Sequence, residues 1–219
     1  MATLFLIRHG LTSQTGKVLY GRTAGVELDR RGRAQAEELV RRFDRVRLTA
    51  IYASPLERCV QTVGPLATAQ GLAVRPSDAL IEMDAGTWTG RSLARLRRSK
   101  EWPTVQTNPA AFAFPQGEAF VAAQERAVAE VRRIAARHPR GRVAVASHGD
   151  IIRIVAAHFL GTPLDRFQAV VIDTAAVSVL AMQRGHGRVV LLNDTGGLSR
   201  FGIDPTPPWE ATSAVKLRG

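Results

Sequence analysis

The stretch Thr3-Leu4-Phe5-Leu6-Ile7-Arg8-His9-Gly10 decides the expected fold, because Thr3 and four apolar residues lead directly into three residues that suit a functional site. A short, uninterrupted apolar run is typical of a strand covered on both faces, as in parallel sheets. Ligands bind beyond the carboxyl ends of such strands. His9 is therefore a candidate nucleophile, Arg8 a candidate phosphate ligand, and Gly10 a turn that can approach a ligand closely. By itself, the segment fits a structural histidine at least as well.

A second segment, Ser54-Pro55-Leu56-Glu57-Arg58, follows the apolar run Ala50–Ala53. Ser54 as the N-cap, Pro55 as the first helical residue and Glu57 three positions after the cap predict a helix start of the capping-box type. Arg58 then lies in the first helical turn, where free backbone N–H groups and the helix dipole favour an anion. The alternative is an ordinary surface helix that carries one solvated arginine.

Another strand that ends in a histidine is predicted at Ala144-Val145-Ala146-Ser147-His148-Gly149, with an apolar helical stretch after it. If this strand and the first one are parallel members of one sheet, their carboxyl ends lie at the same edge of that sheet. His9 and His148 can then converge on a single site.

Two carboxylates lie in the loop between residues 80 and 90. Glu82 and Asp84 stand among apolar residues and precede Gly86 and Gly90. One of them could act as an acid at the site formed by the strand ends. The alternative is a glycine-rich turn whose acidic side chains are solvated.

These segments together resemble the histidine phosphatase superfamily, in its phosphoglycerate mutase-like branch. The resemblance covers about residues 3–195, and its motifs occur in the family's order. They are Arg8-His9-Gly10, Ser54-Pro55-Leu56-Glu57-Arg58, Leu80-x-Glu82, Gly86-x-Trp88-x-Gly90, Phe114-Pro115-Gln116-Gly117-Glu118 and Ser147-His148-Gly149.

The resemblance implies that His9 attacks a phosphoryl group to form a phosphohistidine, which water then hydrolyses. It further implies that Arg8, Arg58 and His148, with Gly149 beside them, bind the phosphoryl group, and that Glu82 protonates the leaving oxygen. The chemistry is consistent with this, because nearby guanidinium groups favour the neutral, nucleophilic form of a histidine. A backbone carbonyl is expected to hold its second ring nitrogen. Since positioned cations stabilise the transferring phosphoryl group, no metal or cofactor is expected.

Some positions depart from the family's pattern or concern specificity. Thr15 stands where many members have an asparagine that contacts the transferred phosphate, so that contact is either made by a hydroxyl or lost. Tyr20 and Arg22 lie on a loop that often lines the substrate pocket. Arg22 either binds a second anionic group or faces water. Ala119 replaces a common serine.

The order of the expected elements argues for an α/β fold. We expect a three-layer α/β/α sandwich whose central sheet is mainly parallel, with one antiparallel edge strand. Strands at 177–183 and 188–193 are expected to form a hairpin around Arg184-Gly185-His186-Gly187. Residues 1–196 are expected to form a single domain, with 91–117 as a variable lid, and residues 197–219 a loose tail. Helices are expected at about 31–43, 55–70, 118–137 and 151–160.

Composition narrows the classes of protein further. The chain has 219 residues, a formal net charge of +11 and a single cysteine, Cys59, so an intrachain disulfide is impossible. No apolar run is long enough to cross a bilayer and no export signal is recognised, which favours a cytoplasmic protein. The excess charge is mostly arginine spread along helices without a nucleic-acid-reading motif, so it is expected to attract phosphorylated substrates and not nucleic acid.

The leading hypothesis is a metal-independent phosphomonoester hydrolase that uses His9 on a small phosphorylated substrate. The alternative is a phosphoglycerate mutase-type phosphomutase with the same phosphohistidine; the short insert before His148 and the presence of Thr15 favour hydrolysis. A catalytically silent phosphate sensor is a third hypothesis, which the intact set of candidate residues argues against. The resemblance also suggests a homodimer that pairs through an edge strand.

Overall fold

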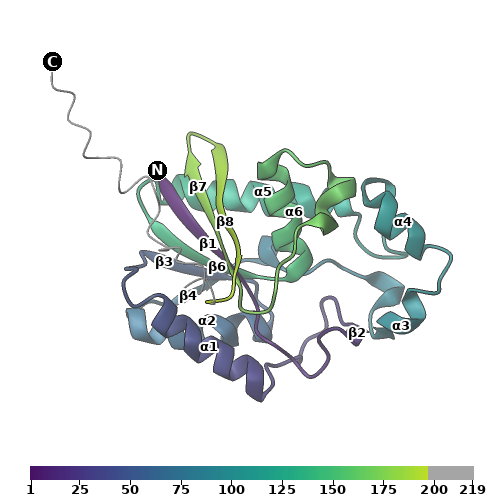
Figure 1. The fold of residues 1–219 in the computed structure, drawn as a ribbon, viewed down its shortest axis with the longest axis horizontal. Coiled ribbons are helices and arrows are strands. Elements are labelled where there is room, and N and C mark those ends of the chain that lie inside the picture. The colour runs from purple at the N-terminus through teal and green to yellow at the C-terminus, as the bar shows by residue number, and fades with distance from the viewer. Residues whose placement is uncertain (197–219) are drawn as a thin grey trace.

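The computed structural model describes residues 1–196, whose centre is a six-stranded sheet in the order β4-β3-β6-β1-β7-β8 (Figure 1). β1, β3, β4 and β6 run parallel to one another. The strands are β1 (Ala2–Arg8), β3 (Ala50–Ala53), β4 (Val74–Pro76), β6 (Arg142–Ser147), β7 (Val177–Gln183) and β8 (His186–Asp194). The predicted mainly parallel α/β sheet is confirmed.

The antiparallel pairings lie at one edge of the sheet. β7 runs antiparallel to β1, and β8 returns antiparallel to β7. The two strands are joined through Arg184 and Gly185, which both have positive φ values, 50° and 81°. Two such residues are typical of a tight hairpin turn. The predicted hairpin is therefore confirmed, although its turn is shorter than expected, because His186 already belongs to β8.

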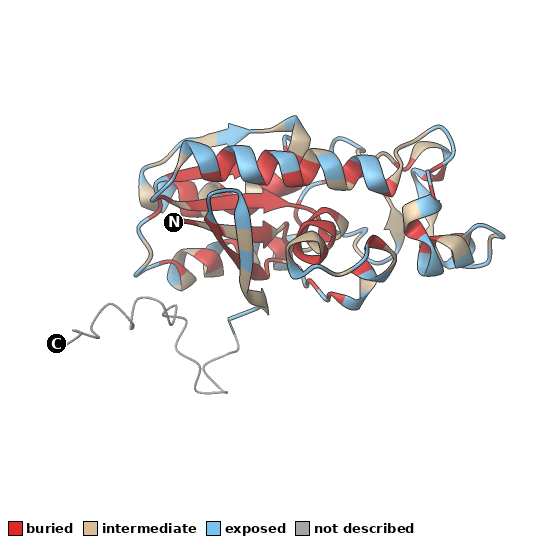
Figure 2. Cartoon of the chain, turned by 90° about the horizontal axis from the view of Figure 1, so that it is seen from above, coloured by how far each residue is buried: buried red, intermediate tan, exposed pale blue. Residues whose placement is uncertain are grey.

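Helices cover both faces of the sheet (Figure 1). Because successive side chains of a strand point to opposite faces, Leu4 and Leu6 of β1 belong to one apolar cluster and Ile7 to another. The first cluster includes residues of α5 (Phe120–Arg137) and α6 (Gly149–Leu160), and the second includes residues of α1 (Arg30–Arg42) and α2 (Glu57–Gln70). Figure 2 shows the buried residues concentrated on the sheet and on the inner sides of these helices. The three expected layers are present.

The predicted start of α2 is wrong. The helix begins at Glu57, Leu56 occupies the cap position, and no side chain caps the first turn. The Ser54 hydroxyl forms its short hydrogen bond, 2.8 Å, with the ring of His148. Its contact with the Leu56 N–H is long, at 3.4 Å. The capping-box pattern failed because His148, which follows the neighbouring strand β6, offers this hydroxyl a better partner than the helix does.

Short elements gather beyond the carboxyl ends of the parallel strands (Figure 1). β2 pairs with β5 in a small separate sheet, and the segment after β5 forms two short helices. These elements are β2 (Val18–Leu19), η1 (Asp78–Leu80), η2 (Gly86–Trp88), β5 (Arg91–Ser92), α3 (Leu93–Leu96), α4 (Trp102–Thr107), η3 (Pro109–Ala111) and η4 (Leu164–Ala169). Within residues 1–196, no helix combines the length and apolar character needed to cross a membrane. The tail expected at 197–219 lies outside the described residues.

Candidate active site

The sheet brings the two strand-end histidines together. β1 and β6 are neighbours with Arg8 opposite Ser147, so the next residue of each strand reaches the same edge. The backbone N–H of His9 donates to the carbonyl of Ser147 at 2.9 Å. The rings of His9 and His148 lie 5.4 Å apart between centroids, at 60°. The convergence expected from parallel strands is therefore confirmed.

The backbone fixes which nitrogen of His9 is free. Its Nδ1 lies 2.8 Å from the Gly10 carbonyl oxygen. Because a carbonyl can only accept, Nδ1 carries the proton and Nε2 keeps its lone pair. This is the expected backbone contact. The Tyr20 hydroxyl lies 3.5 Å from Nε2.

The surroundings of His9 keep its ring neutral. Burial is the largest cause that lowers the pKa of His9 to about 3, and the positive charges of Arg58 and Arg8 lower it further. The Gly10 carbonyl acts in the opposite direction. At neutral pH the imidazole is thus unprotonated, which is the form that can attack an electrophile.

Gly10 is needed for packing of the backbone. A Cβ at this position would lie 2.9 Å from the carbonyl oxygen of Gly32 in α1. The N–H of Gly10 donates to the Thr62 hydroxyl at 2.9 Å. The close neighbour that requires a glycine is therefore the backbone of α1, whereas the sequence suggested a ligand.

Arg8 and Arg58 are each held by hydrogen bonds to backbone carbonyls. Arg8 donates from Nη1 to the Ile172 carbonyl at 2.6 Å. Arg58 donates from Nη2 to the Gly21 carbonyl at 2.8 Å and from Nη1 to the Thr23 carbonyl at 3.4 Å. The guanidinium of Arg58 also lies over the Tyr20 ring, 4.7 Å from its centroid. Within the described chain, the buried Nε of each arginine has no hydrogen-bond partner. A buried N–H group without a partner is available to donate to an anion.

His148 is completely buried, and its ring lies next to Ser54 and Glu82. Its Nε2 lies 2.8 Å from the Ser54 hydroxyl, and its Nδ1 lies 3.8 Å from Oε2 of Glu82. Burial, followed by the charge of Arg58, holds the pKa of His148 well below its usual range. Cys59 packs against the same ring, with Sγ 3.5 Å from Nε2. The neutral imidazole can therefore donate a hydrogen bond to a ligand from one of its nitrogens.

Glu82 has the properties of an acid that is protonated near neutral pH. Burial, and then the charge of Asp150, raise its pKa to about 7, while the Met83 N–H, Arg58 and Arg8 act against them. Its Oε1 accepts from the Met83 N–H at 2.9 Å, and the side chain keeps 16% of its surface exposed. Glu82 can thus hold a proton and still reach a ligand.

Asp84 and Arg22 lie behind Glu82. Arg22 donates from Nε to the Glu82 carbonyl at 2.9 Å and from Nη2 to the Glu118 carboxylate at 3.1 Å. Asp84 lies 3.9 Å from Arg22 and accepts from the Gly86 N–H. The Arg22 guanidinium therefore connects the acid loop to Glu118, while 36% of its side chain stays exposed.

A cavity of about 480 Å³ opens in front of His9. Five of the site residues that the sequence predicted line it: Arg8, His9, Tyr20, Glu82 and Gly149. Arg58 and His148 lie buried behind them. Thr15 and Arg22 do not line the cavity; the Thr15 hydroxyl instead bonds to the N–H and hydroxyl of Thr12, both at 3.0 Å. The structure therefore separates these two from the other candidates.

Gly149 allows Arg8 to reach the site. A Cβ on Gly149 would lie 3.1 Å from Nε and 3.2 Å from Cζ of Arg8. The missing side chain thus leaves space for the guanidinium at the start of α6.

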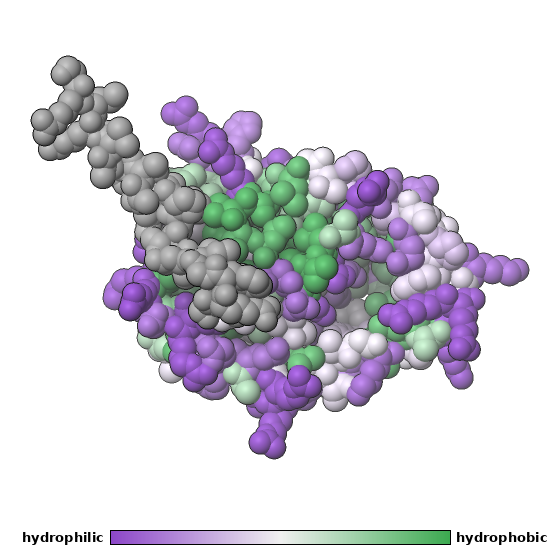
Figure 3. Space-filling model, viewed as in Figure 1, coloured by the Kyte–Doolittle hydropathy of each residue, from purple (hydrophilic) through white to green (hydrophobic). Residues whose placement is uncertain are grey.

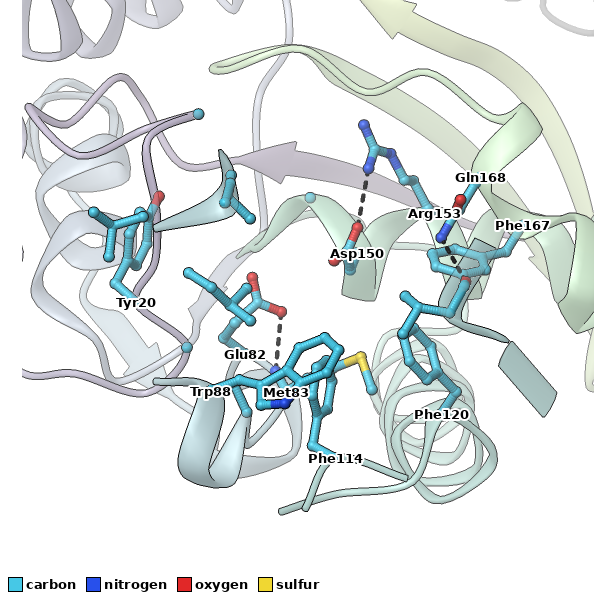
Figure 4. A pocket seen from close by; sticks show the side chains of 18 of the residues that line it. Tyr20, Glu82, Met83, Trp88, Phe114, Phe120, Asp150, Arg153, Phe167 and Gln168 are labelled. Atoms are coloured by element: carbon cyan, nitrogen blue, oxygen red, sulfur yellow. Dashed lines mark hydrogen bonds and ion pairs between the residues drawn. The ribbon is translucent and has the colours of Figure 1, made fainter. Parts of the chain in front are cut away.

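Sequence reasoning missed a group of cavity residues after His148. Asp150 faces the cavity opposite Glu82 (Figure 4), and its Oδ1 accepts from Arg153 at 3.0 Å. Phe167 and Gln168 of η4 complete that wall. The position of Asp150, two residues beyond the second histidine, was a usable signal. Nothing in the sequence near Phe167 marks it as part of a site.

Comparisons with known proteins agree with this geometry. The profile of the histidine phosphatase superfamily (branch 1) matches residues 4–195. Phosphoserine phosphatase 1 of Hydrogenobacter thermophilus is 28% identical over 206 residues, which cover 93% of this chain and 98% of that protein. The adenosylcobalamin/alpha-ribazole phosphatase of Escherichia coli is 27% identical over 192 residues, covering 87% and 95%. The solved structure of Bacillus stearothermophilus YhfR has a TM-score of 0.83 at 27% identity, covering 89% and 98%. The chain belongs to the histidine phosphatase superfamily.

Proposed function

We propose that the chain is a metal-independent phosphomonoester hydrolase in which His9 is the nucleophile. The observation that carries the proposal is the lone pair on Nε2 of a neutral His9, which faces a cavity beside the buried, unpartnered Nε atoms of Arg8 and Arg58. This arrangement suits a phosphoryl group, whose oxygens gain negative charge as it is transferred.

The first step transfers the phosphoryl group to the protein. Nε2 of His9 attacks phosphorus and forms a P–N bond while the ester P–O bond breaks. Glu82 gives its proton to the departing oxygen, so the alcohol leaves neutral. Arg8, Arg58 and His148 stabilise the phosphoryl oxygens during this transfer.

The second step regenerates the protein. Water attacks phosphorus and gives a proton to the Glu82 carboxylate, the P–N bond breaks, and inorganic phosphate leaves. His9 returns to its neutral form and Glu82 to its protonated form. Relatives named as phosphatases support this outcome over return of the phosphoryl group to the substrate.

The test is phosphate release from a panel of phosphomonoesters in the presence of EDTA. We expect turnover by the wild-type protein and a loss on the order of 10⁴-fold or more in His9→Ala. The control is His158→Ala, because His158 contacts Arg132 on the outer side of α6 and does not line the cavity. Brief exposure to phosphate-labelled substrate should leave acid-labile, base-stable label on the wild-type chain only.

Other outcomes of this test support the alternatives. Formation of 2-phosphoglycerate from 3-phosphoglycerate and a trace of the bisphosphate would support a phosphomutase. Substrate binding without turnover would support a silent sensor. Turnover that needs an added divalent metal would contradict the mechanism.

We assign the net charge of +11 to attraction of small phosphorylated substrates and not of nucleic acid. Arg41 and Arg42, at the end of α1, show how the basic residues are distributed among acidic partners. Arg41 pairs with Glu38 on the helix, and Arg42 binds Asp194. The assignment predicts a kcat/KM that falls as salt is added and no retention of DNA or RNA at physiological salt.

A homodimer and a cytoplasmic location remain parts of the proposal. β8 is an edge strand of the sheet, and Figure 3 shows hydrophobic residues gathered where Figure 1 draws β8 and α6. An unpaired strand edge beside apolar surface can pair with a second copy. A monomer mass in sedimentation at all concentrations would contradict the dimer. The cellular location of a tagged copy tests the cytoplasmic location.

A further inference from the structure

The cavity has two different sides. In Figure 4, Tyr20 and Glu82 lie on one side and Phe120 and Phe167 on the opposite side. We call the second side the aromatic chamber and define it by the five rings that line it: Trp88, Trp102, Phe114, Phe120 and Phe167. These rings come from η2, α4, the loop before α5, α5 itself and η4. The phosphoryl group needs only the first side.

The aromatic chamber is preformed. Trp88 stacks on Trp102 at 6.4 Å and 18°, and it contacts Phe114 edge-on at 5.5 Å. Phe114 stacks on Phe120 at 5.6 Å, and Phe120 contacts Phe167 at 5.4 Å. Rings that already pack against one another lose little freedom when a ligand arrives, so binding there does not require ordering of the wall.

The size of the cavity points to a large leaving group. Its volume of about 480 Å³ lies within the range of roughly 300–1,000 Å³ that is usual for sites of drug-sized ligands. A small polar alcohol such as serine, attached to a phosphoryl group held by His9, would leave the aromatic chamber filled with water. A ring-bearing alcohol would displace that water and contact the rings.

The acidic groups of the cavity argue in the same direction. A small amino-acid ester would need an unpaired carboxylate for its ammonium group, although the lining Arg97 is available to its carboxylate. Asp150 and Arg153 already bind each other at 3.0 Å. Gln168 donates its amide to the Val105 carbonyl. Glu82 is the acid of the reaction, so its carboxyl group must stay protonated to act.

We propose that the aromatic chamber selects phosphomonoesters whose alcohol carries a flat aromatic ring system, and that Trp102 contributes directly to this selectivity. The inference rests on the proposed function, because the ester is placed with its phosphoryl group at His9. The polar side of the site then serves every substrate, while the aromatic chamber distinguishes among them.

The test compares two esters that differ only in the ring. Ethyl phosphate and 2-(1-naphthyl)ethyl phosphate release alcohols of similar reactivity, since the ring lies two carbons from the ester oxygen. We expect kcat/KM at least tenfold higher for the naphthyl ester with the wild-type protein. O-phosphoserine is expected to behave like ethyl phosphate.

The variant Trp102→Ala separates selectivity from folding. Trp102 lies on the short helix α4 and is only partly buried, so its removal leaves the sheet and the phosphoryl side in place. We expect a fall of about tenfold in kcat/KM for the naphthyl ester and less than twofold for ethyl phosphate. The matched control is Phe159→Ala, which removes an aromatic ring of α6 outside the aromatic chamber and should change neither value.

Two results would overturn the inference: equal or better use of O-phosphoserine by the wild-type protein, or an equal loss for both esters in Trp102→Ala. Both are distinct from failure of the proposed function, in which neither ester would release phosphate in a manner that depends on His9.

Discussion

The phosphoryl side of the cavity and the aromatic chamber are built in different ways. On the phosphoryl side, His9, Arg8 and Arg58 are each held by a hydrogen bond to a backbone carbonyl. The aromatic chamber is held by ring packing between the start of α5 and short elements that do not belong to the main sheet. The difference suggests that changes on the first side affect turnover of every ester, whereas changes on the second affect the choice of ester.

Replacing the acid should give a large loss of activity, and the size of the loss should depend on the leaving group. In Glu82→Gln, kcat for an alkyl phosphate is expected to fall roughly 10²–10⁴-fold, the usual contribution of general acid catalysis. A phenolic ester with a stable leaving anion, such as 4-nitrophenyl phosphate, should lose far less. Initial rates with both esters measure this. An equal loss for both would mean that Glu82 does not supply the proton.

Removing the Arg58 guanidinium should lower kcat for every ester by the same factor. For Arg58→Gln we expect roughly 10²–10³-fold lower kcat for both the naphthyl and the ethyl ester, as for loss of one donor to a developing charge. Arg58→Lys keeps the positive charge but lacks the planar guanidinium, so its kcat should lie between those of the wild-type protein and Arg58→Gln. Thermal unfolding of each variant controls for loss of the Gly21 contact. If the ratio of kcat for the naphthyl ester to kcat for the ethyl ester changed, the phosphoryl side would also affect the choice of ester.

Asp150→Asn should change the pH profile more than the maximal rate. Because the charge of Asp150 is one of the causes that raise the pKa of Glu82 to about 7, its removal should lower that pKa. Glu82 must be protonated to act, so the basic limb of kcat/KM for an alkyl ester should move to lower pH, with little change on the acidic side. Asp173→Asn lies outside the cavity and is the control. An unmoved limb would show that Asp150 does not act on Glu82.

Much of the phosphoryl side could be predicted from the sequence, because it depends on features that act locally. Apolar runs ending in His-Gly indicate strand ends, and the ends of parallel strands converge at one edge, which brought His9 to His148. The same reasoning was wrong for Ser54. Its hydroxyl had two suitable partners, and the choice depends on how closely β3 approaches β6, which local spacing does not show.

The aromatic chamber could not be predicted, since its five rings come from separate segments with no shared periodicity. Trp102 and Phe114 lie in the stretch expected as a variable lid, but Phe167 follows β6 by about twenty residues and no nearby motif marks it. The contacts of Arg22 could not be predicted for a similar reason. Its partners, the Glu82 carbonyl and the Glu118 carboxylate, are distant in the sequence, so its loop position indicated only that it lies near the cavity.

The buried thiol of Cys59 offers a way to observe the phosphoryl side alone. It is the single cysteine of the chain and lies against His148, and burial raises its pKa to about 12. A thiol in this state resists alkylating reagents while the protein is folded. Its rate of labelling therefore reports how often α2 separates from the sheet, independently of any movement of the short helices around the aromatic chamber.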